Sequence, residues 1–194
     1  MRPSGTEADE ALVLEAQKGS GAHFDALVDR YTPIVYRIAL GITRNPFEAE
    51  EVVQETFLRA FKHLDQFSPS KATFRTWLLT ITRNQSINLF KSLKRKAARF
   101  LLDHESGTAE SEYAGDARSD QSQDAEHLLS TKQQYARVKK ALARLPERQQ
   151  TALMLKTQEN MSYEEIASIM NTSVSSVESL LFRARKKLLE LLED

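Results

Sequence analysis

The stretch at residues 105–123 divides the chain, because its side chains are too small and too polar to enter a core. It reads ESGTAESEYAGDARSDQSQ. A segment with so little apolar surface cannot offset the conformational entropy that is lost when it becomes ordered. We therefore predict a flexible acidic linker at residues 100–130, which joins an N-terminal domain at residues 8–99 to a C-terminal domain at residues 131–194.

The composition of both parts favours an all-α fold of two small helical domains. Gly (6) and Pro (5) are scarce among the 194 residues, and helix-forming residues dominate. No apolar run approaches the roughly 18 residues that cross a bilayer. The N-terminus lacks the apolar stretch of a secretory signal, so we expect a cytoplasmic protein. Cysteine is absent, which excludes disulfides and thiolate metal sites.

Local signals place the starts of several helices. Asn45-Pro46 is typical of a capped helix with Pro at its first position, and Thr73 can cap a second helix. Residues 162–165 and 175–178 each have the pattern of a capping box, and residues 170–173 form a turn between them. These signals predict two short helices joined by a tight turn near the C-terminus.

The helix after Pro46 is amphipathic. Its predicted outer face carries Glu51, Glu55, Arg59 and Lys62. Its predicted buried face contains Val53, Phe57, Ala60, Phe61 and Leu64. A carboxylate-rich outer face is either a solvated surface or a surface that docks on another protein.

Charge is unevenly distributed along the N-terminal domain. From Gln66 to Leu102 there are eight basic residues and no acidic one. At 100° per residue, a polar stripe follows the helix after Thr73, opposite the apolar face of Phe74, Trp77 and Ile81. The stripe consists of Thr80, Asn84, Asn88, Lys91 and Arg95. Amides bind base edges and basic side chains bind phosphates, so the stripe is either a DNA surface or a solvated basic face.

The loop before this helix, at residues 68–73, contains Lys71 and lies between Phe67 and Phe74. Aromatic rings beside a basic loop can stack on unpaired bases. The alternative is that both rings belong to the core.

Residues 162–186 fit a helix-turn-helix, whose second helix enters the major groove of DNA. The outward residues of that helix are Ser175, Ser176, Glu178, Ser179, Phe182, Arg183, Arg185 and Lys186. The basic members can bind phosphates. The alternative is a small helical bundle with a basic end.

The sequence carries no catalytic or metal-binding motif. It contains no G-x-S-x-G, no P-loop and no H-E-x-x-H. None of the four histidines follows a glutamate by three residues, as a di-iron bundle would require. We expect no enzyme activity, no cofactor, no metal and no small-molecule substrate.

Five separate segments, in order, resemble the extracytoplasmic-function sigma factors of the sigma-70 family. Residues 47–61 are similar to conserved region 2.2 and residues 73–84 to regions 2.3 and 2.4. Residues 145–153 resemble region 4.1, and residues 161–167 and 177–185 resemble region 4.2. A lone helix-turn-helix is not specific, but several motifs in the right order are.

The resemblance implies a protein that binds core RNA polymerase and directs it to promoter DNA with −10 and −35 elements. The polymerase clamp would contact Glu51, Gln54, Glu55, Leu58 and Arg59. The −10 element would be melted, and a flipped base held, by a set that contains Lys71, Thr73, Phe74, Trp77, Thr80, Asn84, Asn88, Lys91 and Arg95. The linker would thread through the polymerase, and an anti-sigma factor is a further partner of many relatives.

The predicted recognition helix departs from the family at two positions. Many members carry a basic residue after the recognition-helix Val and an Arg two residues later, whereas this chain has Glu178 and Leu180. A carboxylate in the groove accepts from cytosine N4. We therefore expect an unusual −35 preference.

A second hypothesis is an ordinary helix-turn-helix regulator that binds an operator without polymerase. It accounts for the C-terminal domain, but it leaves the helix at residues 47–61 and the loop at residues 68–73 without a role. A gel shift separates the two hypotheses, because a sigma factor binds a promoter strongly only with core polymerase.

Overall fold

The computed structural model describes residues 5–103 and 136–193, and the described residues are helical with no strand. The elements are α1 (Gly5–Gln17), α2 (Gly21–Thr43), α3 (Pro46–Lys62), the 3-10 turn η1 (Leu64–Gln66), α4 (Phe74–Asp103), α6 (Glu147–Thr157), α7 (Tyr163–Ile169) and α8 (Val174–Glu193). Residues 136–143 are also helical. The predicted all-α fold is confirmed. Most of the predicted linker, residues 104–130, lies outside the described residues.

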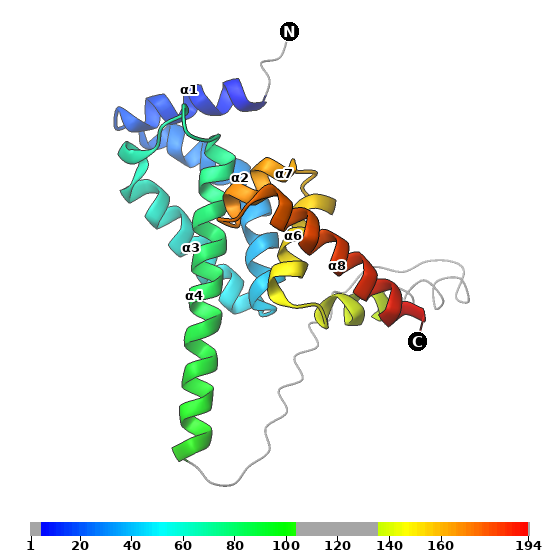
Figure 1. Cartoon of the computed structure of the whole chain (residues 1–194). Helices are drawn as coiled ribbons and strands as arrows, with labels where there is room; N and C mark the ends of the chain where they lie inside the picture. Colours follow the sequence, from blue (N-terminus) through cyan, green and yellow to red (C-terminus); the bar gives the residue numbers. More distant parts are fainter. Residues whose placement is uncertain (1–4, 104–135, 194) are drawn as a thin grey trace, which may run out of the picture.

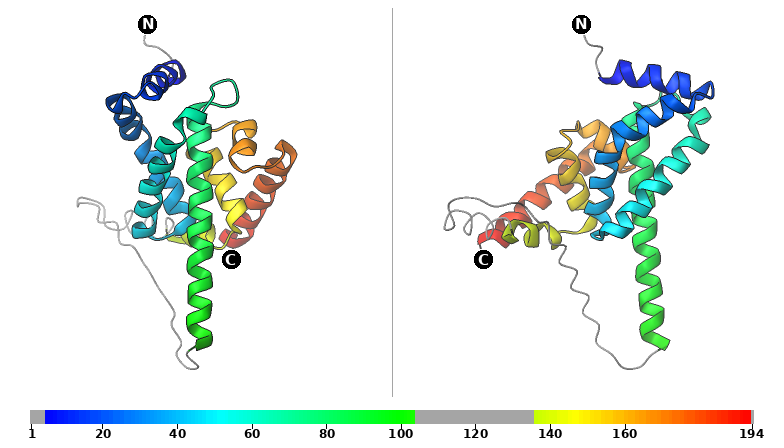
Figure 2. Two further views of the ribbon diagram at one scale, coloured as in Figure 1. Left: turned by 90° about the vertical axis from the view of Figure 1, so that its left-hand side faces the viewer. Right: turned by 180° about the vertical axis from the view of Figure 1, so that it is seen from behind.

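The N-terminal unit is a bundle in which α2, α3 and α4 pack on one another and α1 crosses one end (Figure 1). Two predicted helix starts are confirmed. The Asn45 side chain accepts a hydrogen bond from the Phe47 N–H at 3.0 Å, and Thr73 Oγ1 accepts one from the Thr76 N–H at 3.2 Å. The C-terminal half of α4 extends beyond the bundle (Figure 2).

The C-terminal unit contains α6, α7 and α8. The capping box at the start of α7 is confirmed: Ser162 Oγ accepts from the Glu165 N–H at 3.2 Å, while Glu165 accepts from the Ser162 N–H at 2.8 Å. The turn after α7 is also confirmed, with Asn171 in the left-handed region at a φ of 46°.

The predicted capping box at residues 175–178 is wrong. α8 begins at Val174, and Ser173 Oγ accepts a hydrogen bond from the Ser176 N–H at 3.2 Å. Ser173 is therefore the capping residue, because the turn ends and the helix begins two residues earlier than the pattern predicted. Ser175 and Glu178 lie inside the helix and are exposed.

The two units pack against each other through an interface that the sequence analysis did not predict. α6 lies against α2, and α7 lies against α4. Gly41 of α2 allows this approach, because a Cβ at that position would lie 2.6 Å from Met154 Sδ of α6. Buried apolar residues of both units form one continuous cluster.

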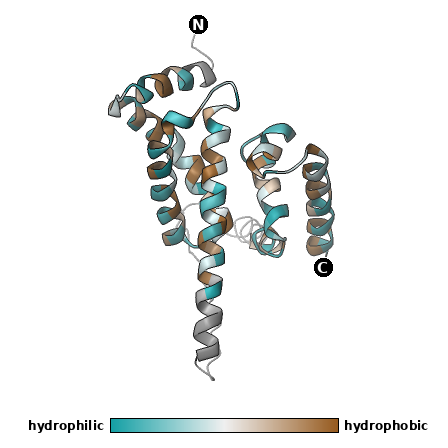
Figure 3. Ribbon diagram, turned by 60° about the vertical axis from the view of Figure 1, so that its left-hand side comes forward, coloured by the Kyte–Doolittle hydropathy of each residue, from teal (hydrophilic) through white to brown (hydrophobic). Residues whose placement is uncertain are grey.

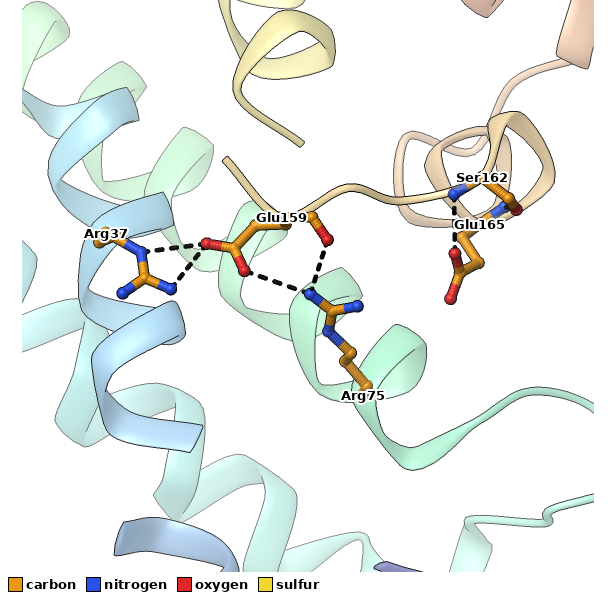
Figure 4. A network of polar contacts seen from close by, with 5 residues as sticks. All are labelled: Arg37, Arg75, Glu159, Ser162 and Glu165. Atoms are coloured by element: carbon orange, nitrogen blue, oxygen red, sulfur yellow. Dashed lines mark hydrogen bonds and ion pairs between the residues drawn. The ribbon is translucent and has the colours of Figure 1, made fainter. Parts of the chain in front are cut away.

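Ion pairs also join the two units. The carboxylate of Glu159, whose side chain is 6% exposed, accepts hydrogen bonds from Arg37 of α2 and from Arg75 of α4 (Figure 4). Glu147 of α6 lies 3.9 Å from Arg83 of α4. Burial lowers the pKa of Arg83, and the Glu147 charge opposes this shift. Basic residues of one unit thus face acidic residues of the other.

Candidate nucleic-acid interface

The loop at residues 68–73 presents polar residues to solvent, while its flanking rings enter the core. Lys71 and Thr73 are exposed. Phe67 and Phe74 are buried, with their centroids 5.7 Å apart in an edge-to-face contact. The predicted stacking of these two rings on unpaired bases is therefore not supported, because neither ring offers a free face. Trp77 is half-buried and packs on both rings.

The polar stripe of α4 lies on the surface over most of its length. Asn84, Asn88, Lys91 and Arg95 are exposed. Thr80 is half-buried, and its hydroxyl donates to the Thr76 carbonyl at 2.8 Å. The stripe runs from the bundle onto the projecting half of α4, where no other helix of the described chain covers it (Figure 2). Amide and basic side chains thus lie along one accessible side of a single helix.

A groove of about 450 Å³ lies on the surface between α3 and α4. Its lining includes Glu51, Gln54, Glu55 and Leu58, which are four of the five residues predicted to contact polymerase. Asn88 of the stripe lines the same groove from α4. The fifth residue, Arg59, is exposed and forms an ion pair with Glu55. The two predicted surfaces therefore adjoin each other.

The predicted buried face of α3 needs one correction. Phe61 is 59% exposed, although its ring makes an edge-to-face contact with Phe24 at a centroid distance of 5.1 Å. Phe57 and Ala60 are buried as predicted. Phe61 lies at the margin of the apolar face, where the neighbouring helices cover only one side of it.

α8 separates its residues clearly into two faces, and polar and apolar segments alternate along it (Figure 3). Val177, Leu180, Leu181 and Ala184 are buried against α6 and α7. The predicted outward residues are exposed, except Ser176, which is half-buried. Phe182, on the outer face, is 68% exposed.

The structure explains one of the two departures on α8. Leu180 is 7% exposed and belongs to the core, so it is not part of the outer face that was predicted to read DNA. Glu178 is exposed on the outer face. Of the two positions, only Glu178 is accessible for the predicted base contact.

A concave polar site at the start of α8 contains a residue that the sequence analysis missed. It has a volume of about 310 Å³ and is lined by Arg148, Thr172, Ser175, Ser176, Ser179, Leu180 and Arg183. Arg148 comes from α6 and is exposed. Two guanidinium groups beside several hydroxyls suit a phosphate. No local pattern could place Arg148 there, because it lies 26 residues before α8 begins.

The described residues hold no group of three or more His, Cys, Asp or Glu side chains that could bind a metal ion. Within residues 5–103 and 136–193, no helix is both long and apolar enough to span a membrane. The features that gather on the loop at residues 68–73, on the polar stripe and at the start of α8 are amides, hydroxyls and basic side chains.

Comparisons with known proteins match most of the chain. Family models described as Sigma-70 region 2 and Sigma-70, region 4 match residues 27–96 and 135–188. RNA polymerase sigma-H factor of Pseudomonas aeruginosa is 32% identical over 93% of this chain and 91% of its own length. ECF RNA polymerase sigma-E factor of Escherichia coli K12 is 33% identical over 92% of this chain and 91% of its own length.

Two solved structures have a similar fold. CnrH in complex with the cytosolic domain of CnrY gives a TM-score of 0.68 at 28% identity, covering 96% of this chain and 97% of that one. The sigma factor RpoE in complex with the anti-sigma factor NepR, from Bartonella quintana, gives 0.64 at 29% identity, covering 88% and 96%.

Proposed function

Because the chain belongs to the extracytoplasmic-function group of the sigma-70 family, we propose that three of its surfaces make the contacts of transcription initiation. The function is that of its family: it binds core RNA polymerase and directs promoter-specific initiation. We propose that it acts in the cytoplasm as a binding subunit and not as a catalyst. An anti-sigma factor is a further proposed partner, because RpoE, a structural neighbour, is solved with one.

The α3 side of the groove is the proposed polymerase surface. Glu51, Gln54, Glu55 and Leu58 line it, and Leu58 is 48% exposed. An exposed leucine among carboxylates suits a basic partner surface with an apolar centre. The observation that carries the assignment is that this surface adjoins the polar stripe through Asn88. A polymerase bound on α3 therefore receives DNA that runs along α4.

The polymerase assignment is tested with Glu55→Arg and Leu58→Asp. Each change places an unfavourable charge in the proposed interface. Where such a charge lies close to a charge of the partner, the loss of binding free energy is several kcal/mol. We expect both variants to lose co-purification with core polymerase. Glu50→Arg is the matched control, because Glu50 is exposed on the same helix but does not line the groove. Retention of polymerase by both variants contradicts the assignment.

The loop at residues 68–73 and the polar stripe are the proposed −10 surface. Lys71 supplies a cation beside the start of α4, and Asn84 and Asn88 supply amides for base edges. We expect Lys71→Ala and Asn84→Ala to impair opening of the −10 element more than polymerase binding, by about 1–3 kcal/mol per lost base contact. Permanganate footprinting of unpaired thymines measures this. Unchanged reactivity in both variants counts against the surface.

The outer face of α8 is the proposed −35 surface, to which we add Arg148. Arg183, Arg185 and Lys186 are placed for phosphates, whereas Glu178 and Ser179 lie nearer the end of the helix that meets bases. Removal of one phosphate contact lowers affinity for all promoters equally and reduces the salt slope by about one charge.

Glu178→Lys tests base reading on α8. The change replaces an acceptor suited to cytosine by a donor suited to guanine. When a randomised −35 library is transcribed in vitro, we expect this variant to select −35 sequences that differ from those selected by the parent. Selection of the same sequences as the parent removes Glu178 from the set of base-reading residues.

A further inference from the structure

The helix α1 precedes the segment that the region 2 model matches, residues 27–96, and the functions proposed above give it no role. It is nevertheless fixed on the bundle. Val13 and Ala16 are buried in the core. Asp9 is also buried, forms an ion pair with Arg30 and accepts a hydrogen bond from the Tyr31 hydroxyl. Because α1 is held on the bundle at several points, it can in turn fix the position of a neighbouring segment.

The last residue of α1, Gln17, reaches across to the segment that leads into the proposed −10 loop. Its side-chain nitrogen donates to the carbonyl of Leu64 at 2.8 Å and to the carbonyl of Phe67 at 3.1 Å. These residues lie 47 and 50 positions later in the chain. One amide thus ties the beginning and the end of the short turn η1 to α1.

The loop itself is a local turn with two anchored ends. The Lys71 N–H donates to the Ser68 carbonyl at 3.1 Å, and the hydroxyls of Ser68 and Ser70 are 2.9 Å apart. The second end of the loop is Thr73, which caps α4. The first end is Phe67, which Gln17 holds by its carbonyl. The side chain of Lys71 therefore depends on both anchors for its place relative to α4.

We infer that Gln17 is a positioning residue for −10 recognition. Its side-chain amide, at the end of α1, holds the segment before the loop through two hydrogen bonds. The inference rests on the proposed function of the loop at residues 68–73. Base recognition needs side chains held within about 0.5 Å of the productive geometry. Loss of the Gln17 amide leaves the Phe67 ring packed in the core but frees its carbonyl, so the backbone that enters the loop can shift and −10 bases are discriminated less well.

Two variants test the inference. Gln17→Met keeps the size and the helix propensity of the side chain but removes both donors. Gln17→Ala removes the side chain beyond Cβ. The matched control is Lys18→Ala on the neighbouring position, where the lysine is 61% exposed and pairs only locally with Glu15 among the described residues. Lys71→Ala serves as the control for the proposed function.

The measurement is base discrimination by the holoenzyme. A promoter is first selected from a library randomised at −10 and −35, using the parent chain and core polymerase. Holoenzyme with each variant then transcribes that promoter and promoters with single-base substitutions in either element. We expect Gln17→Met and Gln17→Ala to lower discrimination at −10 by about twofold to tenfold, the range expected for losing one or two modest hydrogen bonds. We expect these two variants to keep the −35 discrimination and the polymerase co-purification of the parent. The Lys18→Ala control is expected to keep the parental discrimination at both elements.

Each other outcome overturns a specific statement. If Lys71→Ala lowers −10 discrimination and the Gln17 variants do not, Gln17 is not a positioning residue. If Lys71→Ala also keeps parental discrimination, the proposed function of the loop fails. If the Gln17 variants weaken −10 discrimination, −35 discrimination and polymerase binding alike, together with a lower melting temperature, Gln17 only stabilises the fold and the inference is wrong.

Discussion

Removal of the Glu159 carboxylate is expected to separate the two helical units. The carboxylate accepts hydrogen bonds from Arg37 Nε at 3.0 Å, Arg37 Nη2 at 2.8 Å and Arg75 Nη2 at 3.2 Å. The Arg75 guanidinium also donates to the Glu159 carbonyl, a contact that substitution by alanine keeps. Glu159→Ala therefore tests the side-chain pairs alone.

The size of the effect follows from burial. Breaking a fully buried ion pair costs about 3–5 kcal/mol. The Glu159 side chain is 6% exposed, but the Arg37 and Arg75 side chains are 50% and 31% exposed. Solvent around the arginines screens most of the interaction, as in surface pairs, so we expect about 1–2 kcal/mol. That energy raises the ratio of open to closed chains by about 5-fold to 30-fold.

The assay is single-molecule energy transfer in the full chain. The natural sequence has no cysteine, so Lys62→Cys and Lys186→Cys give two unique dye positions, both exposed. We expect Glu159→Ala to increase the low-transfer population. The matched control is Glu190→Ala, which removes a pair with Lys187 in which both side chains are 50% exposed. Equal populations in Glu159→Ala and Glu190→Ala refute the reasoning.

The separation bears on function, because a promoter needs both units at once. The −10 and −35 elements are about 25 base pairs apart, which is about 85 Å of duplex at 3.4 Å per base pair. The longest helix, α4, has 30 residues and is about 45 Å long at 1.5 Å per residue. The proposed −10 and −35 surfaces therefore have to lie farther apart than the length of this helix when both elements are bound, and Glu159→Ala is expected to favour such an arrangement.

Three further outcomes are expected from stability measurements on the full chain. Leu155→Ala, at a fully buried position shared by the core, should lower the free energy of unfolding by about 2–5 kcal/mol in urea titrations. Ser173→Ala should cost about 1 kcal/mol while Ser175→Ala costs almost nothing, since Ser173 caps α8; equal losses contradict this cap. Burial and the hydrogen bond to Asp9 raise the pKa of Tyr31, so its stabilisation is complete below pH of about 10 and is lost as pH rises towards the folded pKa. Tyr31→Phe should flatten the decline of unfolding free energy above that pH, and an unchanged slope rejects this.

The local structure of the chain could be predicted from its sequence, because the groups that interact there are close neighbours. The caps at Asn45, Thr73 and Ser162 each join residues no more than three positions apart. The exposed stripe of Asn84, Asn88, Lys91 and Arg95 follows from helical periodicity alone. The same local logic failed at Ser175, because the turn before α8 starts the helix at Val174 and makes Ser173 the capping residue.

The tertiary structure decided which side chains of these helices are covered, because the covering groups come from distant parts of the chain. Phe74 is buried by Tyr31 and Phe67, whereas Phe61 is left exposed by its neighbours. Arg148 reaches the start of α8 only through the packing of α6 on α8. Glu159 meets Arg37 across 122 positions, and Gln17 meets Phe67 across 50. Helical periodicity fixes the direction of a side chain on its own helix, but it does not say which other helix lies in that direction.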